Sequence, residues 1–366
     1  MKETITLKKS GLEMVRNRAV TLKDICRKTG YAVSTISSVL NNDVSCFASQ
    51  KVKEEILKTA KEFGYHPNLL YRGLKKQKTN VIGLIVPSLR THITRSITEL
   101  IGSFAEKAGY HIFIGYSHND VAKEEMLLRD FVSHRVDGII LIIAEEGKNR
   151  QELQYILNQN LPFVTIGKLK SFPFSFVSTD YYLGGQLAAS HLAELGHKKV
   201  GIIYLSASET ISQRIAGFKD TAYRYMMKVE EIPLQKNKRR ISKEEFEEEK
   251  LIQETCEYAK KVLHKKDRPT AIFAGNDEIA VGVIKTAIES GIKVPDDLSV
   301  MGFDDSLSAI FSPVPLTTIR QKRHEVSEMA VKILLNKINT GTEEQVEKWI
   351  PTELIIRSST AKVKMD

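Results

Sequence analysis

The sequence has few cysteines, a single tryptophan and no long apolar run. Its three cysteines, Cys26, Cys46 and Cys256, are too few and too scattered for a disulfide framework or a zinc site, so we expect them to be small, buried hydrophobic residues. No stretch of about 18 apolar residues occurs, and the N-terminal segment lacks the apolar centre of a signal peptide. We therefore expect a cytoplasmic protein that has no membrane partner.

The sequence also lacks the common enzyme signatures. It contains no GxxxxGKS/T phosphate loop, no GxGxxG after an apolar strand, no GxSxG nucleophile turn and no HExxH zinc pair. We therefore predict no catalytic residue, no metal and no cofactor. An enzyme and a periplasmic-type solute-binding protein stay open as alternatives, because a fold by itself does not dictate a function.

Positive charge is concentrated near the N-terminus. Residues 1–80 contain 16 Lys and Arg against 7 Asp and Glu, a net charge of +9, which equals the net charge of the whole chain of 366 residues. The remaining residues are therefore neutral in sum. This asymmetry is typical of a nucleic-acid-binding region, although a solvated basic face would give the same count.

The first eighty residues predict three short helices. Apolar residues at positions 22, 25 and 26 form a helical stripe after the candidate cap Thr21, and Gly30 ends that helix. A second stripe, at positions 33, 36 and 40, follows after a link as short as those of helix-turn-helix motifs. A third helix is expected from about 49 to 63. Its expected apolar face comprises Val52, Ile56, Leu57, Ala60 and Phe63. On this pattern alone, an ordinary three-helix bundle stays open.

The rest of the chain alternates short apolar strands with amphipathic helices. The expected strands are VIGLIV, HIFIGY, GIILII, PFVTIG, KVGIIY, TAIFAG and LSVMGF. Such alternation is typical of parallel sheets that are covered by helices on both faces. This number of strands is larger than a single sheet readily accommodates.

Several segments occur in an order that points to one protein family. They are TLKDICRKTG, STISSVLNN, GYHPN and RGLKKQKTNVIGLIVP, followed by VDGIIL, HLAELGHKKV, QRIAGF, GNDEIAVG, GFDDS and LTTIRQ. Together they resemble the lactose-repressor/galactose-repressor (LacI) family of bacterial transcription regulators. Only residues 1 to about 19 fall outside the resemblance, so both an extra basic arm and a start at Met14 stay open.

The resemblance implies an α/β chain in which an all-helical helix-turn-helix domain precedes a two-lobed, doubly wound effector domain like that of periplasmic binding proteins. The implied parts are a basic N-terminal extension at 1–19, the helix-turn-helix DNA-binding domain at 20–66, a hinge helix and linker at 67–79, an effector-binding and dimerisation domain at 80–360, and a tail at 361–366. Lobe 1 would span about 80–178 and 321–345, and lobe 2 about 179–320 and 346–360.

The resemblance also implies which residues meet DNA. The second helix of the motif would lie in the major groove, with Val33, Ser34 and Ser38 as base readers. The arginine that is frequent in the family at the position of Ser38 is missing, so we expect base discrimination weaker than, or distributed differently from, the ~1–3 kcal/mol of an arginine pair. The other expected DNA contacts are Thr21, Thr35, Ser37, Asn41, Lys51, Asn68, Arg72 and Leu74. Leu74 takes the position of a leucine that family members insert into the minor groove, although it would also suit a domain junction.

A second implied site would hold a small molecule. Arg214, Asn276 and Asp304 match positions where family members hydrogen-bond a ligand, usually a sugar or a purine. In lobe 1, PSLRTHITRS replaces an Asn-Pro-Phe-Phe run, which puts Thr91 at the position of the asparagine and Ile93 at that of a phenylalanine. Lys168 at the rim would accept a phosphate or a carboxylate. Asp277 is assigned to structure rather than to ligand contact.

These expectations combine into one mechanism. Two identical subunits match two half-sites, so we expect a homodimer on a pseudo-palindromic operator. A small-molecule effector, expected to be a sugar, would bind between the lobes and change operator affinity by induction or corepression. Repression is the usual outcome in the family.

Overall fold

The protein is described here by a computed structural model, which covers residues 20–40, 46–65, 78–143, 150–205, 208–234 and 247–364, with the backbone alone at 247–252. The expected N-terminal extension and four expected DNA contacts lie outside the described residues. These contacts are Asn41, Asn68, Arg72 and Leu74. The chain divides into two units, residues 1–79 and 80–366.

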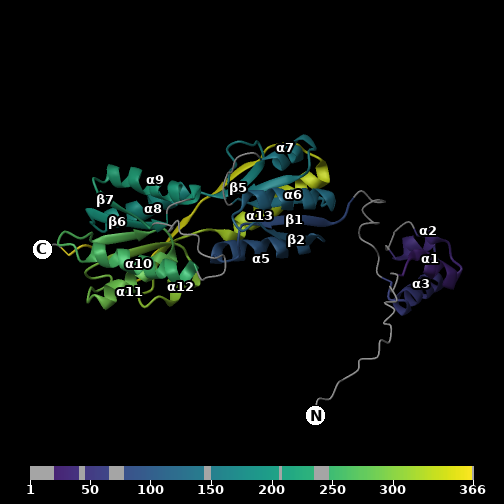
Figure 1. Cartoon of the computed structure of the whole chain (residues 1–366), viewed down its shortest axis with the longest axis horizontal. Helices are drawn as coiled ribbons and strands as arrows, with labels where there is room; N and C mark the ends of the chain where they lie inside the picture. The colour runs from purple at the N-terminus through teal and green to yellow at the C-terminus, as the bar shows by residue number, and fades with distance from the viewer. Residues whose placement is uncertain are drawn as a thin grey trace, which may run out of the picture. The chain divides into compact units, whose positions relative to one another are not determined.

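Three helices, α1 (Leu22–Thr29), α2 (Val33–Leu40) and α3 (Gln50–Glu62), make up the described part of the first unit (Figure 1). The carboxylate of Asp24 accepts hydrogen bonds from the backbone N–H and the hydroxyl of Thr21, at 2.8 and 2.6 Å, at the start of α1. Gly30 has a left-handed φ of 75° and donates to the Cys26 carbonyl, which ends α1 as expected. The short link to α2 gives the helix-turn-helix arrangement that the sequence predicts.

The core of this unit differs in part from the expected helical face. It comprises Ile25, Ile36, Val39, Ile56 and Ala60. Leu57 and Phe63, which we expected there, are 48% and 37% exposed. Leu57 is rotated by about 100° around the helix axis from Ile56, and Phe63 lies beyond the last turn of α3.

The first sheet of the second unit is parallel, in the order β11-β5-β4-β3-β1-β2. Its strands are β1 (Val81–Val86), β2 (His111–Tyr116), β3 (Gly138–Ile142), β4 (Phe163–Ile166), β5 (Ser175–Thr179) and β11 (Glu347–Ile350). Its helices are α5 (His92–Lys107), α6 (Val121–Ser133), α7 (Gln151–Asn158) and α13 (Arg323–Thr340). Buried apolar clusters flank this sheet, which explains why β1 and β3 are apolar along their whole length.

The second sheet has the order β12-β10-β9-β8-β6-β7 and is parallel except for β12. Its strands are β6 (Lys199–Leu205), β7 (Lys228–Leu234), β8 (Ala271–Ala274), β9 (Ser299–Asp304), β10 (Thr317–Arg320) and β12 (Glu353–Ile355). Its helices are α8 (Tyr181–Glu194), α9 (Glu209–Arg224), α10 (Glu247–Leu263), α11 (Asp277–Glu289) and α12 (Leu307–Phe311). Figure 1 shows the second unit as two lobes, each built on one sheet.

The chain crosses between the lobes three times, and the last crossing lies later than we expected. Residues 346–350 were assigned to lobe 2, but β11 pairs with β5 in the first sheet, with Glu347 opposite Phe176. The indole of Trp349 also packs edge-on against the ring of Phe176, at 5.2 Å between ring centres. This strand pairing keeps the segment in lobe 1 up to Ile350.

Helices α8 and α9 touch at the level of their backbones. A methyl group on Gly185 of α8 would overlap the carbonyl of Arg214, and one on Gly217 of α9 would overlap the carbonyl of Tyr182. Only glycine permits such a close approach. The two helices are therefore packed as a rigid pair.

The cysteines are half-buried rather than fully buried, because they lie at the margins of the cores. Cys26 and Cys46 pack against the N-terminal core, and the Cys256 thiol points to the Gly282 carbonyl at 3.8 Å. Across the described ranges, no helix is long and apolar enough to cross a membrane. Within the same ranges, His, Cys, Asp and Glu side chains form no cluster of three that would hold a metal ion.

Candidate functional site

The exposed part of α2 is its first turn. Val33 is 39% exposed and Ser34 is exposed, whereas Thr35, Ser37 and Ser38 are half-buried. A recognition helix contacts base edges with the residues of its N-terminal part. Of the three expected base readers, Val33 and Ser34 are therefore the more accessible, and neither carries a charge.

The surroundings of α2 contain further candidate contacts. Lys51 is exposed in the first turn of α3, as a phosphate contact requires. Thr21, in contrast, donates its hydroxyl to Asp24.

The sequence did not point to two other residues near α2 as candidate DNA contacts. Phe47 is fully exposed ahead of α3, and the hydroxyl of Tyr31 donates to Glu55 at 2.8 Å, which raises the pKa of Tyr31.

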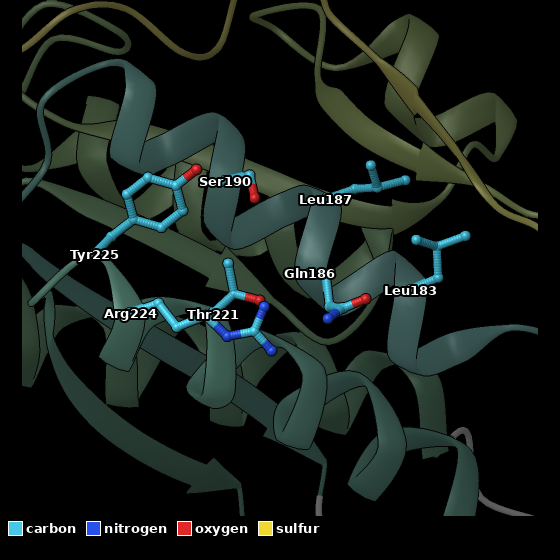
Figure 2. Close-up of a pocket in the computed structure, with 7 residues that line it drawn as sticks. All are labelled: Leu183, Gln186, Leu187, Ser190, Thr221, Arg224 and Tyr225. Atoms are coloured by element: carbon cyan, nitrogen blue, oxygen red, sulfur yellow. The ribbon is translucent and has the colours of Figure 1, made fainter.

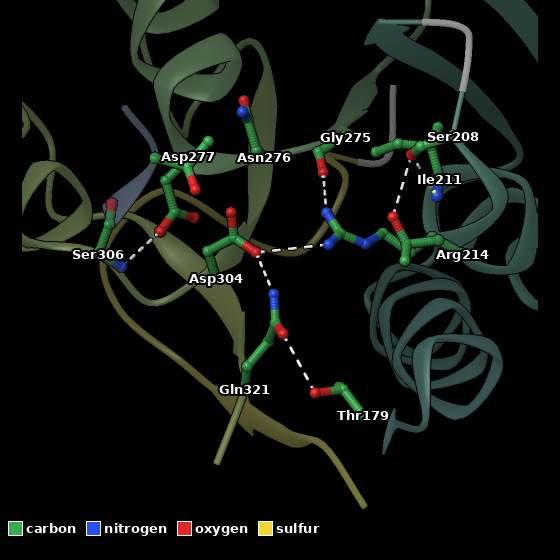
Figure 3. Close-up of polar contacts among 12 residues, drawn as sticks. Thr179, Ser208, Ile211, Arg214, Gly275, Asn276, Asp277, Asp304, Ser306 and Gln321 are labelled. Carbon is green, nitrogen blue, oxygen red and sulfur yellow. Dashed lines mark hydrogen bonds and ion pairs between the residues drawn. The ribbon is translucent and has the colours of Figure 1, made fainter. Parts of the chain in front are cut away.

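Arg214 of α9 is at the centre of the expected ligand site (Figure 3). Its side chain is 8% exposed, and its guanidinium carbon lies 3.8 Å from the ring centre of Phe303. One terminal nitrogen donates to the Gly275 carbonyl at 2.5 Å, and the other lies 3.6 Å from the Asp304 carboxylate. The Nε of Arg214 has no hydrogen-bond partner among the described residues. Such an unsatisfied buried donor costs free energy unless a ligand or a water accepts its hydrogen bond.

Asp304 is the last residue of β9, and its hydrogen bonds connect the Arg214 site with segments of both lobes. Its φ of 118° lies in a region that a residue other than glycine rarely adopts. Its carboxylate accepts a hydrogen bond from the Gln321 amide at 2.6 Å, and Gln321 accepts one from the Thr179 hydroxyl at 3.1 Å. Because Thr179 and Gln321 lie at two of the crossings between the lobes, the network connects Arg214 with the segments that join the lobes.

Burial raises the pKa of two carboxyl groups in this site. It raises the pKa of Asp304 to about 6, although the positive charge of Arg214 opposes the shift. Burial also raises the pKa of Asp277 to about 8, and repulsion from Asp304 adds to that shift. The Asp277 carboxylate accepts hydrogen bonds from the Ser306 N–H at 2.7 Å and the Thr318 hydroxyl at 2.5 Å. Asp277 therefore holds the segment after β9.

Only part of the Asn276 side chain is available for the expected ligand contact. Its side-chain oxygen accepts a hydrogen bond from the Ile279 N–H at 2.9 Å and caps α11. This leaves the amide NH₂ group as the donor that could meet a ligand. Asn276, Asp304 and Gln321 lie at the C-terminal ends of β8, β9 and β10, the edge where open α/β sheets bind ligands, and Arg214 reaches this edge from α9.

Lobe 1 contributes weaker groups. The Thr91 hydroxyl caps α5 by accepting from the Thr94 N–H at 3.2 Å, and Ile93 packs in part against the lobe 1 core. Between them, burial and the positive charges of Arg323 and Arg95 lower the pKa of His92. Neither expected contact in this segment joins the Arg214 network.

Lys168 differs from its expected role as a free cation at the rim. Its ammonium lies 3.2 Å from the Glu347 carboxylate and 5.2 Å from the ring centre of Phe176. Both partners belong to lobe 1, so the charge of Lys168 is already compensated. The neighbouring Lys170 pairs at 2.9 Å with Glu209 of lobe 2.

Two family descriptions match the chain. "Bacterial regulatory proteins, lacI family" matches residues 21–68, and "Periplasmic binding protein-like domain" matches residues 189–360. The first range contains the three-helix unit, and the second contains Arg214, Asn276 and Asp304.

Individual proteins agree with these matches. The lac repressor dimer bound to operator and the anti-inducer ONPF has a similar fold, with a TM-score of 0.79 and 23% identity over 94% of this chain and 100% of that chain. A LacI family transcriptional regulator from Enterococcus faecalis V583, with bound ribose, has a TM-score of 0.65 and 29% identity over 78% of this chain and 100% of that chain.

A curated relative matches over almost the full length of both proteins. The HTH-type transcriptional repressor PurR of Haemophilus influenzae strain PittEE is 30% identical over 348 residues, which cover 94% of this chain and 99% of that protein. With its helix-turn-helix unit and its two-lobed second unit, the chain belongs to the LacI family of bacterial regulatory proteins and is a DNA-binding transcriptional regulator.

Proposed function

We propose that this regulator represses transcription as a homodimer on a pseudo-palindromic operator, and that a sugar or sugar derivative between its lobes controls operator affinity. The observation that carries the ligand part is the buried Arg214–Asp304 pair, with its unused Nε–H and raised carboxyl pKa. Perturbed, incompletely satisfied charges at strand ends are typical of binding sites.

The chemistry of this pair favours a polyhydroxylated ligand. A guanidinium donates and a carboxylate accepts, so together they bind neighbouring hydroxyls with directional, charge-assisted hydrogen bonds. The Enterococcus faecalis relative with bound ribose supports a sugar as the ligand class. Asn276 would add its amide donor, while Thr91 and Ile93 would form the opposite wall without an aromatic ring.

The DNA-reading surface supports recognition by neutral side chains. Val33 and Ser34 are exposed on α2, and position 38 carries a serine instead of an arginine. The helix therefore offers an apolar side chain and hydroxyl groups to the bases, and no arginine that could bond to guanine through two hydrogen bonds. We propose that Lys51 contacts a phosphate. The dimer in the operator-bound lac repressor structure supports one subunit per half-site.

The function is tested by selection from a random duplex DNA library with the full-length chain at about 150 mM salt, where nonspecific binding is weak. The selection is run without ligand, and then with ribose, with sugar phosphates and with purines. Enrichment of a short palindrome in at least one arm is expected. Absence of any enriched sequence from every arm, with folding verified, would contradict the proposal.

Two variants separate base reading from phosphate contact. Ser34→Ala is expected to relax the preference for one base position by about 1 kcal/mol while nonspecific binding is retained. Lys51→Gln is expected to weaken binding to all sequences and to reduce the slope of log K against log salt by about 1. Fluorescence anisotropy with matched and scrambled duplexes measures both effects. A uniform loss for Ser34→Ala would contradict its role as a base reader.

A further inference from the structure

A hollow of about 440 Å³ lies between α8 and α9, apart from the Arg214 network. Its lining residues are Leu183, Gln186, Leu187, Ser190, Thr221, Arg224 and Tyr225 (Figure 2). Its volume is within the range of small-molecule sites. Arg214 lies in the first half of α9, whereas the α9 residues of the hollow lie in its last turn and at its C-cap.

One side of the hollow contains a buried hydroxyl that is not satisfied. Thr221 is 4% exposed, and its Oγ1 has no hydrogen-bond partner among the described residues. Helical threonines elsewhere in this chain donate to the carbonyl four residues earlier, as Thr98 and Thr286 do at 2.8 Å. The Thr221 hydroxyl does not make this bond, and Arg224 and Gln186 line the same hollow (Figure 2). A buried hydroxyl without a partner is unfavourable, so a group that bonds to it would be stabilised.

The charge of the hollow is positive. Arg224 is exposed and forms no ion pair with the described residues. The nearby carboxylate of Asp220 accepts a hydrogen bond from the Tyr182 hydroxyl at 2.7 Å. The described residues that line the hollow include no Asp or Glu. A cation in the last turn of a helix is common by itself, but here it adjoins hydroxyl and amide groups that surround a hollow.

We propose that this hollow is a second ligand site, for a small organic anion with an apolar body. A carboxylate or phosphate group would pair with Arg224 and bond to the hydroxyls of Thr221 and Ser190. Leu183 and Leu187 would contact the carbon part of the ligand. The site is independent of the proposed sugar site, since it shares none of that site's residues.

The test titrates phenyl phosphate and benzoate, in separate arms, into the full-length chain and follows saturation-transfer NMR. Saturable binding below about 10 mM is expected for at least one anion, with benzyl alcohol binding at least about tenfold more weakly. The tighter of the two anions identifies the head group. Arg224→Gln is expected to weaken anion binding by about tenfold, and Thr221→Val by about threefold.

Two controls locate the anion. Lys260→Gln removes an exposed charge from α10 of the same lobe, and unchanged binding is expected. Arg214→Met alters the proposed sugar site, so binding that persists in this variant places the anion outside it. Three results would overturn the proposal: no saturable binding, equal binding by Arg224→Gln, or loss of binding in an Arg214→Met protein that circular dichroism shows to be folded. Because Arg224 is exposed, its substitution leaves the fold intact, which circular dichroism verifies.

Discussion

The strand ends of the two lobes differ in how their polar groups are satisfied. In lobe 2, Arg214, Asp304 and Gln321 are buried and bonded to one another, yet the Nε of Arg214 has no partner among the described residues. In lobe 1, Thr91 caps its own helix and Lys168 pairs with its neighbour Glu347. Lobe 2 therefore offers preorganised groups for a ligand, whereas lobe 1 mostly satisfies its own groups.

Lobe 1 also buries charges, but at another place. Arg150 lies between the carboxylates of Glu124 and Glu125, and burial raises the pKa of Glu124 to about 7 against the effect of Arg150. These groups belong to α6 and to the residue that precedes α7, not to the strand ends. Buried charge alone therefore does not identify a ligand site. Buried charge at the C-terminal ends of the strands does support a ligand site.

The largest effect should come from removing either buried arginine. Arg214→Met and Arg150→Met each leave a buried carboxylate without its partner, so each is expected to lower the free energy of unfolding by about 3 kcal/mol, measured by urea denaturation. Only Arg214→Met should also weaken binding of the proposed sugar ligand, by about 100-fold in calorimetry. Equal sugar affinities of the two variants would remove the distinction between the lobes.

The next effect depends on pH. Because the folded-state pKa of Asp304 is raised from 3.8 to about 6, the stability that its neutral form contributes is present near pH 4 and is lost as pH rises through 6. In the proposed site the ionised Asp304 carboxylate accepts hydrogen bonds from the sugar, so the affinity for the sugar should fall as pH is lowered from 8 to 5. Asp304→Asn should remove both changes. Because repulsion from Asp304 contributes to the raised pKa of Asp277, Asp304→Asn also lowers the pKa of Asp277.

A smaller effect is expected in lobe 1. Thr91→Ala removes the cap of α5 and should lower the free energy of unfolding by about 1 kcal/mol, measured by thermal denaturation. Affinity for the proposed sugar ligand should change by less than about threefold, and Thr91→Ser should restore stability because it keeps the hydroxyl. A large loss of sugar affinity would show that lobe 1 contributes more than its geometry indicates.

The smallest effect concerns the ion pair that joins the lobes. Lys170 and Glu209 are 60% and 57% exposed, so a double-mutant cycle with Lys170→Gln and Glu209→Gln should give a coupling of about 0.5 kcal/mol. Salt at about 1 M should abolish it. A coupling that persists in salt would mean that this pair holds the lobes more strongly than an exposed ion pair can.

The sequence predicts the fold well where apolar patterns are strong. All seven expected strands form, because helices cover both faces of each sheet. The edge strand β7 (KVEEIPL) was not expected, since its exposed side carries charges that hide the apolar pattern. The late crossover was missed for a related reason. Strand β11 (EKWI) is mostly exposed and is defined by its pairing with β5 rather than by its own residues.

The site was predictable only in its outline. The resemblance points to Arg214 and Asp304, but the bonds that hold them come from Gln321 and Thr179, which are far apart in the chain. Gln321 ends the matched LTTIRQ segment, which was the only signal for it. The ion pair of Lys168 was hidden because its partner Glu347 had been assigned to the other lobe.

The contact between α8 and α9 has a mechanical consequence. With Gly185 and Gly217 in backbone contact, no side chain at this point of contact can absorb a small displacement. A ligand that pulls Arg214 must therefore move α8 together with α9. Helix α8 begins directly after β5, where the chain passes from lobe 1 into lobe 2. The helix pair would thus move as one stiff lever, which transmits a displacement at the proposed sugar site to the first connection between the lobes.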